Sequence, residues 1–165
     1  MMQTDEKLVP HPHLKQFYGA ESQREEFVNR IFDDTASKYD PVNNILSLGS
    51  GIRYRKQALI RSGLTSEMNV LDVATGTGLV AAEVLSIVGS KGSITGLDRS
   101  CNMLREVSNK LNIPLVQGDA NVLPFSDGSF HFLTMGYALR HVNDLKGTFK
   151  EYFRVLKPGG ILLIL

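Results

Sequence analysis

Three acidic residues, each close to the end of a short apolar run, are the residues best suited by type and spacing to bind a ligand. Asp72 precedes a glycine-rich turn that contains Gly76 and Gly78, and Asp98 and Asp119 come at the ends of the next two apolar runs. Glycines in such a turn allow the backbone to approach a ligand closely. A carboxylate accepts hydrogen bonds from hydroxyl and amino groups and attracts positive charge. The sequence therefore indicates a site for a ligand that carries such groups.

The glycine-rich turn is compatible with two kinds of adenine-containing ligand. The segment from Gly76 to Ala81 fits the G-x-G-x-x-A pattern of dinucleotide-binding proteins, and Asp98 follows Gly78 by 20 residues, as a ribose-binding acid does. However, a carboxylate such as Asp72 at the mouth of the turn repels a pyrophosphate and attracts a cation. S-adenosyl-L-methionine carries an ammonium and a sulfonium. We therefore expect S-adenosyl-L-methionine as the cofactor, and a dinucleotide-dependent oxidoreductase is the alternative from another class.

Each acid has an expected part in binding S-adenosyl-L-methionine. Asp98 is predicted to accept hydrogen bonds from both ribose hydroxyls, and Asp119 is predicted to accept one from the adenine amino group. Asp72 is predicted to face the positive groups. The alternative for Asp98 is an N-cap of the following helix, a role that Ser100 can share. The alternative for Asp119 is an ordinary surface acid.

Alternating apolar runs and amphipathic segments supply the elements that must position these acids. The predicted strands are Asn69–Ala74, Ser93–Leu97, Pro114–Gln117, Phe130–Met135 and Ile161–Leu165. The predicted helices between them are Leu79–Val88, Cys101–Leu111 and Asp144–Leu156. This alternation is typical of a parallel sheet with helices on both faces, in which ligands bind beyond the carboxyl ends of the strands. The predicted fold class is α/β, a Rossmann-like three-layer α/β/α core with a mostly parallel sheet.

The chain that precedes this core divides into two parts. Residues 1–20 contain two prolines and few apolar residues, and they are expected to be a mobile arm. Residues 21–66 follow a helical pattern and are expected to form an N-terminal cap, in which one helix covers residues 52–62 after a break at Gly51. Residues 67–165 are the predicted cofactor-binding core.

Composition and charge exclude several classes of protein. The chain has 165 residues, a formal charge of +1 and a single cysteine, so one globular domain without a disulfide is expected. No Cys and His cluster has the spacing of a metal site, and no apolar run approaches the roughly 20 residues that span a bilayer. The balanced charge argues against a nucleic-acid partner, and the basic run Arg53–Lys56 is interpreted as a solvated helix face. We expect a cytoplasmic protein that binds no metal and no nucleic acid.

Four further stretches match the motifs of a known family. They are Lys38–Ser47 (KYDPVNNILS), Leu123–Phe125 (LPF), Leu139–Arg140 and Arg154–Gly160 (RVLKPGG). Together with the acids and the glycine-rich turn, they make the chain resemble class I S-adenosylmethionine-dependent methyltransferases. The resemblance is stronger to the ubiquinone/menaquinone biosynthesis C-methyltransferases, and it covers the region from Phe32 to Leu165.

The resemblance implies methyl transfer to a ring carbon of a polyprenylated hydroquinone or a similar phenol. Arg140 is implied to stabilise the phenolate through its permanent charge, and His141 or a water to take the proton. The alternative for His141 is a solvated loop residue. The implied partner is a small-molecule phenol or quinol, with at most peripheral membrane contact. The expected cofactor-binding residues are Tyr39, Asp72, Thr75, Gly76, Thr77, Gly78, Asp98, Arg99, Asp119 and Ala120.

The sequence departs from the family pattern at several positions. Gly51 and Tyr54 stand where the first family signature has His and Trp, and His141 stands where the family has Asn. These changes bear on the acceptor, so O- or N-methylation of another small molecule stays open, as does a fold that binds cofactor without catalysis. The chain also stops at Leu165, where the family continues with Glu-x-Ser and two further strands. The core is therefore expected to lack its last strands, and the edge of the strand Ile161–Leu165 is expected to pair with a second copy of the chain.

Overall fold

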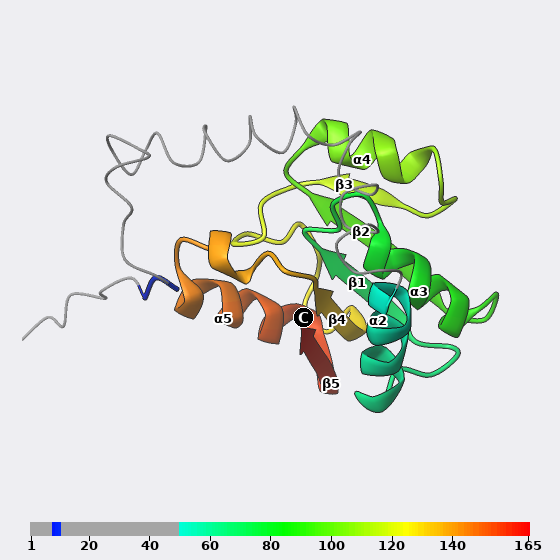
Figure 1. Cartoon of the computed structure of the whole chain (residues 1–165). Helices are drawn as coiled ribbons and strands as arrows, with labels where there is room; N and C mark the ends of the chain where they lie inside the picture. Colours follow the sequence, from blue (N-terminus) through cyan, green and yellow to red (C-terminus); the bar gives the residue numbers. More distant parts are fainter. Residues whose placement is uncertain (1–7, 11–49) are drawn as a thin grey trace, which may run out of the picture.

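A five-stranded parallel sheet forms the centre of the molecule. The computed structural model describes residues 8–10 and 50–165 (Figure 1). The strands lie in the order β3-β2-β1-β4-β5, and every pair of neighbours is parallel. Their bounds are β1 Asn69–Val73, β2 Ser93–Asp98, β3 Leu115–Gln117, β4 Phe130–Met135 and β5 Leu156–Ile164. The predicted α/β fold class is confirmed.

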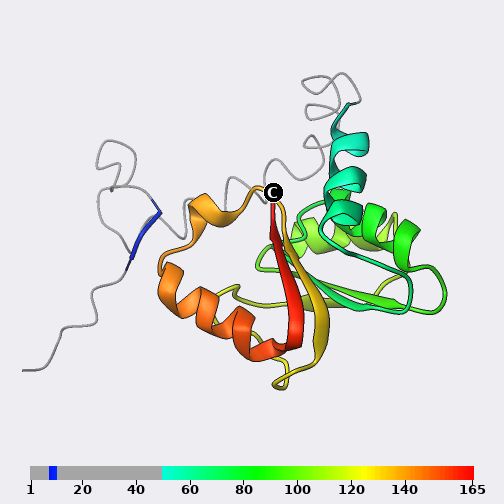
Figure 2. The same ribbon diagram turned by 90° about the horizontal axis from the view of Figure 1, so that it is seen from below.

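Helices cover both faces of this sheet (Figure 2). Helix α3 (Leu79–Val88) connects β1 to β2 and α4 (Cys101–Ser108) connects β2 to β3, whereas α5 (Leu145–Val155) connects β4 to β5. Right-handed connections that step in opposite directions along a sheet place their helices on opposite faces. The direction of stepping reverses between β1 and β4, and in sheets of this type ligands bind at that point of reversal, beyond the carboxyl ends of the strands.

Two apolar clusters fill the space between the sheet and its helices. The cluster on the α5 side includes the buried Leu71 and Tyr152, and the cluster on the α3 side includes Val70 and Val84. Val70 and Leu71 are neighbours in β1 and enter different clusters, because successive side chains of a strand point to opposite faces. The central strands are therefore packed on both sides, which gives the residues at their carboxyl ends a fixed base.

Strand β5 forms one edge of the sheet and starts earlier than the sequence predicts. Its regular pairing with β4 runs from Ile161 to Ile164, within the predicted strand Ile161–Leu165. Leu156 also pairs with Phe130, and the register shifts before Ile161, so that residues 157–160 bulge out of the ladder. This bulge is formed by the Lys-Pro-Gly-Gly end of the motif Arg154–Gly160. Among the described strands, β5 pairs with β4 alone.

Helix α2 (Ser50–Arg61) packs on α3 and differs in two respects from its prediction. The helix includes Gly51, so the expected break at this glycine is wrong within the described residues. Arg55 is buried, and its Nε atom has no hydrogen-bond partner. The interpretation of Arg53–Lys56 as a wholly solvated face is therefore wrong at Arg55, although Arg53 and Lys56 are exposed.

Several predictions fall on parts of the chain that lie outside the described residues. They concern most of the arm 1–20, the cap before Ser50, the motif Lys38–Ser47 and the expected cofactor-binding residue Tyr39. One short piece of the arm is described. The backbone N–H of Leu145, at the start of α5, donates a 2.8 Å hydrogen bond to the carbonyl oxygen of Leu8.

Candidate active site

The glycine-rich loop between β1 and α3 is held close to the end of β2. Three of its residues have positive φ angles, with 54° at Ala74, 57° at Gly76 and 84° at Gly78. The N–H of Thr75 donates to the carbonyl oxygen of Leu97 at 3.0 Å, which ties the loop to β2. A Cβ atom added at Gly76 would meet no atom within 4 Å. Among the described residues, nothing therefore covers the backbone at Gly76, and its approach to a cofactor stays a prediction.

Asp98, at the end of β2, links this loop to the start of α4. Its Oδ2 atom accepts a 2.8 Å hydrogen bond from the N–H of Gly76, and its Oδ1 atom accepts a 2.9 Å bond from the N–H of Ser100. The N-cap of α4 is Ser100, whose Oγ atom accepts from the N–H of Met103 at 3.1 Å. Asp98 is therefore not the N-cap. Its carboxylate lies where the glycine-rich loop meets β2, with one oxygen bonded to the loop.

Asp72 lies deeper than the sequence suggests. It is only 1% exposed, and its two carboxylate oxygens accept hydrogen bonds from the hydroxyls of Thr75 at 2.7 Å and Thr134 at 2.6 Å. Thr134 is the register partner of Asp72 in the neighbouring strand β4. The expectation that Asp72 stands at the mouth of the turn and faces the ligand is therefore wrong, because the side chain lies beneath the loop. Its charge can still act on a ligand above the loop, since Coulomb interactions weaken little across a buried environment.

Burial controls the protonation of Asp72. Removal from water raises its pKa to about 6, although the hydrogen bonds from Thr134 and Thr75 oppose this shift. The nearby carboxylate of Asp98 raises the pKa further. A positive group bound above the loop would act in the opposite direction and favour the ionised carboxylate.

Asp119, two residues after β3, is held by its neighbours in a fixed orientation. Its Oδ1 atom accepts from the backbone N–H of Asn121 at 2.9 Å and from the Asn121 side-chain amide at 2.7 Å. Its Oδ2 atom pairs with the guanidinium of Arg99, which follows Asp98 at the end of β2. Burial pushes the pKa of Asp119 upward, but the bonds from Asn121 and the bond and charge of Arg99 outweigh it and leave the pKa below its usual value. Asp119 is therefore a half-exposed, ionised acceptor.

A second group of candidate residues follows β4. Tyr137 has a φ angle of 59°, which is unusual for an aromatic residue, and its side chain is 52% exposed. Next come Arg140 and His141 in the short helix η1 (Leu139–His141). The Nε–H of Arg140 donates to Nε2 of His141 at 3.1 Å. Because β4 is adjacent to β1, these residues lie at the same end of the sheet as the glycine-rich loop.

The structure thus arranges the predicted site residues in three groups. Asp72, Thr75, Gly76 and Asp98 are joined by hydrogen bonds, Arg99 and Asp119 form an ion pair beside them, and Arg140 and His141 bond to each other. Thr75 and Thr77 are buried, and Gly78 is the N-cap residue of α3, so the loop offers its backbone to a ligand. Ala120, next to Asp119, is half-buried.

Metal binding and membrane crossing are two further properties to consider for the part of the chain that the structure describes, residues 8–10 and 50–165. No group of three or more His, Cys, Asp and Glu side chains there could hold a metal ion. No helix in this described part is long and apolar enough to cross a membrane.

Comparison with known families agrees with this arrangement of residues. The profile of the ubiE/COQ5 methyltransferase family matches residues 19–165. The chain belongs to this family. A demethylmenaquinone methyltransferase of Staphylococcus aureus is 42% identical over 144 residues, and the matched region covers 85% of this chain and 60% of the relative. The chain therefore spans about three fifths of the length of the curated methyltransferase that it matches.

Solved structures show the fold of this methyltransferase family member. An S-adenosylmethionine-dependent methyltransferase from Aquifex aeolicus superimposes with a TM-score of 0.63 at 27% identity, over 67% of this chain and 62% of that one. A putative S-adenosylmethionine-dependent methyltransferase from Methanococcus maripaludis gives a TM-score of 0.70 at 24% identity, over 80% and 62% of the two chains. The core is that of an S-adenosylmethionine-dependent methyltransferase, and the resemblance inferred from the motifs is confirmed.

Some residues that support the candidate site in this family member carry little sequence signal. Thr134 lies 62 residues from its partner Asp72, and Thr148 lies 27 residues from Asn121, to which its hydroxyl donates. The parallel β1–β4 pairing would have pointed to Thr134 once the register was known. For Asn121, the nearby motif Leu123–Phe125 was the feature of the sequence that could have drawn attention to this loop.

Proposed function

We propose that this chain binds S-adenosyl-L-methionine and supports transfer of its methyl group to a ring carbon of a polyprenylated hydroquinone or a similar phenol. The observation that carries the proposal is the row of three acids in a member of the ubiE/COQ5 family, with Asp72 near the end of β1, Asp98 at the end of β2 and Asp119 two residues after β3. The name of the Staphylococcus relative, demethylmenaquinone methyltransferase, supports a quinol-type acceptor.

The residues of the loop and the strand ends fit the proposed methyl donor. Asp98 binds the ribose hydroxyls, and the open backbone at Gly76 lies against the amino-acid part of the donor. Asp119 and Ala120 bind the adenine, and Arg99 holds Asp119. The remaining members of the set are Tyr39, which lies outside the described residues, the buried Asp72 with its charge, and the loop residues Thr75, Thr77 and Gly78. When bound, S-adenosyl-L-methionine supplies a methyl group that is activated by the sulfonium.

Arg140 and His141 are the proposed catalytic residues of the acceptor side. A phenol ring carbon becomes a nucleophile when the phenol loses its proton, and the permanent charge of Arg140 stabilises the resulting phenolate. The Nε2 atom of His141 accepts from Arg140, so in this arrangement His141 orients the guanidinium. The phenol proton passes to a water or, when that bond opens, to Nε2 of His141. Once the methyl group is attached, the ring carbon that received it loses its own proton to a water, which restores the aromatic ring. Tyr137 presents an exposed aromatic face beside them to the acceptor ring.

A product assay tests the proposed reaction. The chain is incubated with methyl-labelled S-adenosyl-L-methionine and a panel of demethylquinols, phenols and amines, and the products are located by mass spectrometry. Label on a ring carbon of a quinol is the expected result. Label on oxygen or nitrogen alone contradicts the acceptor assignment, and calorimetry that shows tighter binding of NAD than of S-adenosylhomocysteine contradicts the cofactor assignment.

The proposal includes a location and a partner for this chain. The protein acts in the cytoplasm, with at most peripheral contact with the membrane that holds a polyprenylated acceptor. Among the described strands β5 pairs with β4 alone, and its other edge is the surface we propose for pairing with a second copy, because an apolar edge strand presents unpaired N–H and C=O groups. Light scattering of this 165-residue chain is expected to show association, and a monomer at all concentrations contradicts this part of the proposal.

A further inference from the structure

One face of α5 contacts the loop that follows β3 along three successive positions. Thr148, Glu151 and Arg154 are three residues apart, so they share this face. The hydroxyl of Thr148 donates to Oδ1 of Asn121, and the carboxylate of Glu151 accepts from the N–H of Leu123 at 2.9 Å. The loop and the helix therefore run alongside each other in a fixed register.

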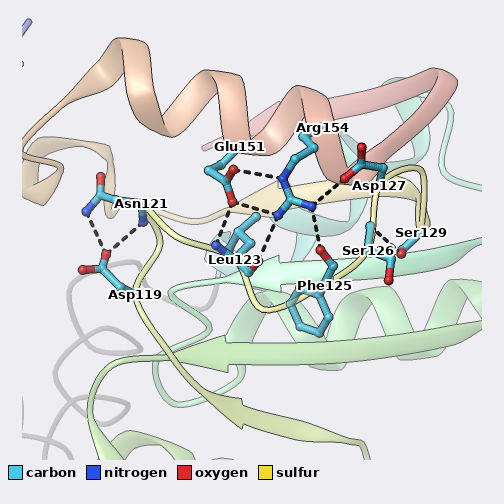
Figure 3. Close-up of polar contacts among 9 residues, drawn as sticks. All are labelled: Asp119, Asn121, Leu123, Phe125, Ser126, Asp127, Ser129, Glu151 and Arg154. Atoms are coloured by element: carbon cyan, nitrogen blue, oxygen red, sulfur yellow. Dashed lines mark hydrogen bonds and ion pairs between the residues drawn. The ribbon is translucent and has the colours of Figure 1, made fainter.

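Arg154, near the C-terminal end of α5, holds the part of the loop from Leu123 to Asp127 (Figure 3). Its guanidinium donates to both carboxylate oxygens of Glu151 at 2.9 Å, to the carbonyl oxygens of Leu123 at 3.0 Å and Phe125 at 2.7 Å, and to Asp127 at 2.8 Å. A guanidinium has five N–H groups, and all five are used in these contacts. The fixed fork of donors allows little sliding of the loop along α5.

The near end of the loop holds Asn121 in one orientation. Its side-chain nitrogen must face Asp119, because an ionised carboxylate can only accept hydrogen bonds. The amide oxygen then faces the hydroxyl of Thr148, which is fully buried and donates to it. Thr148, Asn121 and Asp119 thus form a chain of directed hydrogen bonds from α5 to the proposed adenine-binding acid.

This chain of hydrogen bonds limits what Asp119 can still accept. A carboxylate has about four acceptor positions, two on each oxygen. Asn121 fills both positions on Oδ1, and Arg99 fills one on Oδ2. Within the described part of the chain, one position on Oδ2 is left for a ligand, and its direction is set by the two neighbours that hold the carboxylate.

We infer that Thr148 and Asn121 are positioning residues that aim the remaining acceptor position of Asp119 at an amino group and thereby select adenine over a 6-oxo purine. The inference rests on the proposed function, since it takes Asp119 to bind the adenine of the cofactor. A 6-oxo purine offers an oxygen in place of the amino group, and an ionised carboxylate repels that oxygen. Loss of the Thr148 hydroxyl lets the Asn121 amide rotate, which weakens the discrimination between the two bases.

The discrimination is measured as the ratio of two dissociation constants, for S-inosylhomocysteine and for S-adenosylhomocysteine, by calorimetry on the whole chain. A ratio of about 10 or more is expected for the unaltered chain, because the oxo base leaves a polar group without a partner. Thr148→Val keeps the side-chain shape and removes the hydroxyl, and it should lower the ratio about threefold or more. Thr148→Ser restores the hydroxyl and should restore the ratio.

Two further variants separate positioning from general loss of stability. Val155→Ala removes buried apolar contacts of α5 and none of its hydrogen bonds to the loop, so it should lower the unfolding temperature and leave the ratio unchanged. Asn121→Ala lies in the loop and tests the same hydrogen-bond chain if Thr148→Val does not fold. It should lower the ratio as Thr148→Val does.

The outcomes distinguish this inference from the proposed function. A high ratio in the unaltered chain that Thr148→Val and Asn121→Ala both retain overturns the inference, while adenine binding stands. A ratio near 1 in the unaltered chain, or one that Asp119→Ala does not change, overturns the assignment of Asp119 to adenine and the inference with it. Failure of the unaltered chain to bind S-adenosylhomocysteine overturns the proposed function as a whole.

Discussion

The proposed donor side of the site and the proposed acceptor side are held in place by different means. At the ends of β1 and β2, Asp72 is 1% exposed and bonded to two hydroxyls, and Asp98 bonds to two backbone N–H groups. After β4, Tyr137 is 52% exposed, and Arg140 lies in a single short helical turn. The difference indicates that the donor side is pre-organised, whereas the acceptor side is open for a larger ligand to contact.

The largest effect is expected for Arg140, on the proposed acceptor side, where a substitution should affect catalysis and not binding of the methyl donor. Arg140→Ala should lower the rate of quinol methylation by about 100-fold or more, since removal of one group that stabilises a developing anion costs this much in other enzymes. The affinity for S-adenosylhomocysteine should change little. Rate assays and calorimetry on the same preparation measure the two effects. Equal losses in rate and affinity would place Arg140 on the donor side and break the contrast between the two sides.

On the donor side, Asp98→Ala should weaken binding of S-adenosylhomocysteine by about 1.5–3 kcal/mol, because charge-assisted hydrogen bonds to the ribose are lost. Calorimetry measures this change. Asp144→Ala is a matched control, since Asp144 caps α5 through the N–H of Lys146. The control should lose stability and keep its affinity. Unchanged affinity in Asp98→Ala would leave Asp98 with a structural role only.

The pH dependence of binding tests the buried charge of Asp72. Its pKa is about 6 in the free protein, and a bound cation favours the ionised form, so binding of S-adenosyl-L-methionine should release a proton below pH 6. Affinity should therefore rise as the pH increases to about 6 and then level off. S-adenosylhomocysteine lacks the sulfonium, so the preference for S-adenosyl-L-methionine over it should shrink about threefold at low pH.

A variant that removes the charge of Asp72 provides the control for this pH dependence. Asp72→Asn is similar in shape and cannot ionise, so the preference should no longer vary between pH 5 and pH 7. Stability of the free chain should also respond. The carboxyl has a pKa of 3.8 when unfolded and about 6 when folded, so ionised Asp72 lowers stability progressively as the pH rises through this interval. Urea titrations that show no such decline in the unaltered chain would contradict the raised pKa.

The smallest effect is expected for His141→Asn. The amide oxygen of Asn can accept from Nε–H of Arg140 as Nε2 of His141 does, and Asn is the usual family residue at this position. The methylation rate should stay within about threefold of the unaltered chain. A rate that collapses in this variant, with Arg140 still in place, would instead make His141 the general base.

The fold was predictable where local signals mark the ends of elements. Helix α3 has its predicted bounds because Gly78 and Gly89 flank it. The start of α4 was also found, because Ser100 is a capping residue. The end of α4 was not, since Leu111 continues the apolar pattern but leaves the helix and packs near Gly78. The spacing of apolar residues along the sequence indicates which residues are buried. It does not indicate whether a helix or a turn contains them.

The site was predictable at the level of strand ends and less so at the level of contacts. The positions of Asp98 and Asp119 after β2 and β3 follow from the alternation of apolar runs. The depth of Asp72 does not, because it depends on Thr134 in a strand that pairs only in the folded sheet. The fixing of Asn121 by Thr148 likewise depends on how α5 lies against the loop.

The bond between Asp98 and Gly76 has a consequence for large-scale mutagenesis of this chain. Because one carboxylate joins the loop to β2 and is also the group proposed to bind ribose, substitutions at Asp98 should reduce cellular abundance as well as ligand binding. A screen that scores abundance alone would rank Asp98 among the packing residues of the core. Arg140, which is exposed, would pass the same screen as neutral. Only a paired screen, in which abundance is subtracted from activity, would recover both residues as functional.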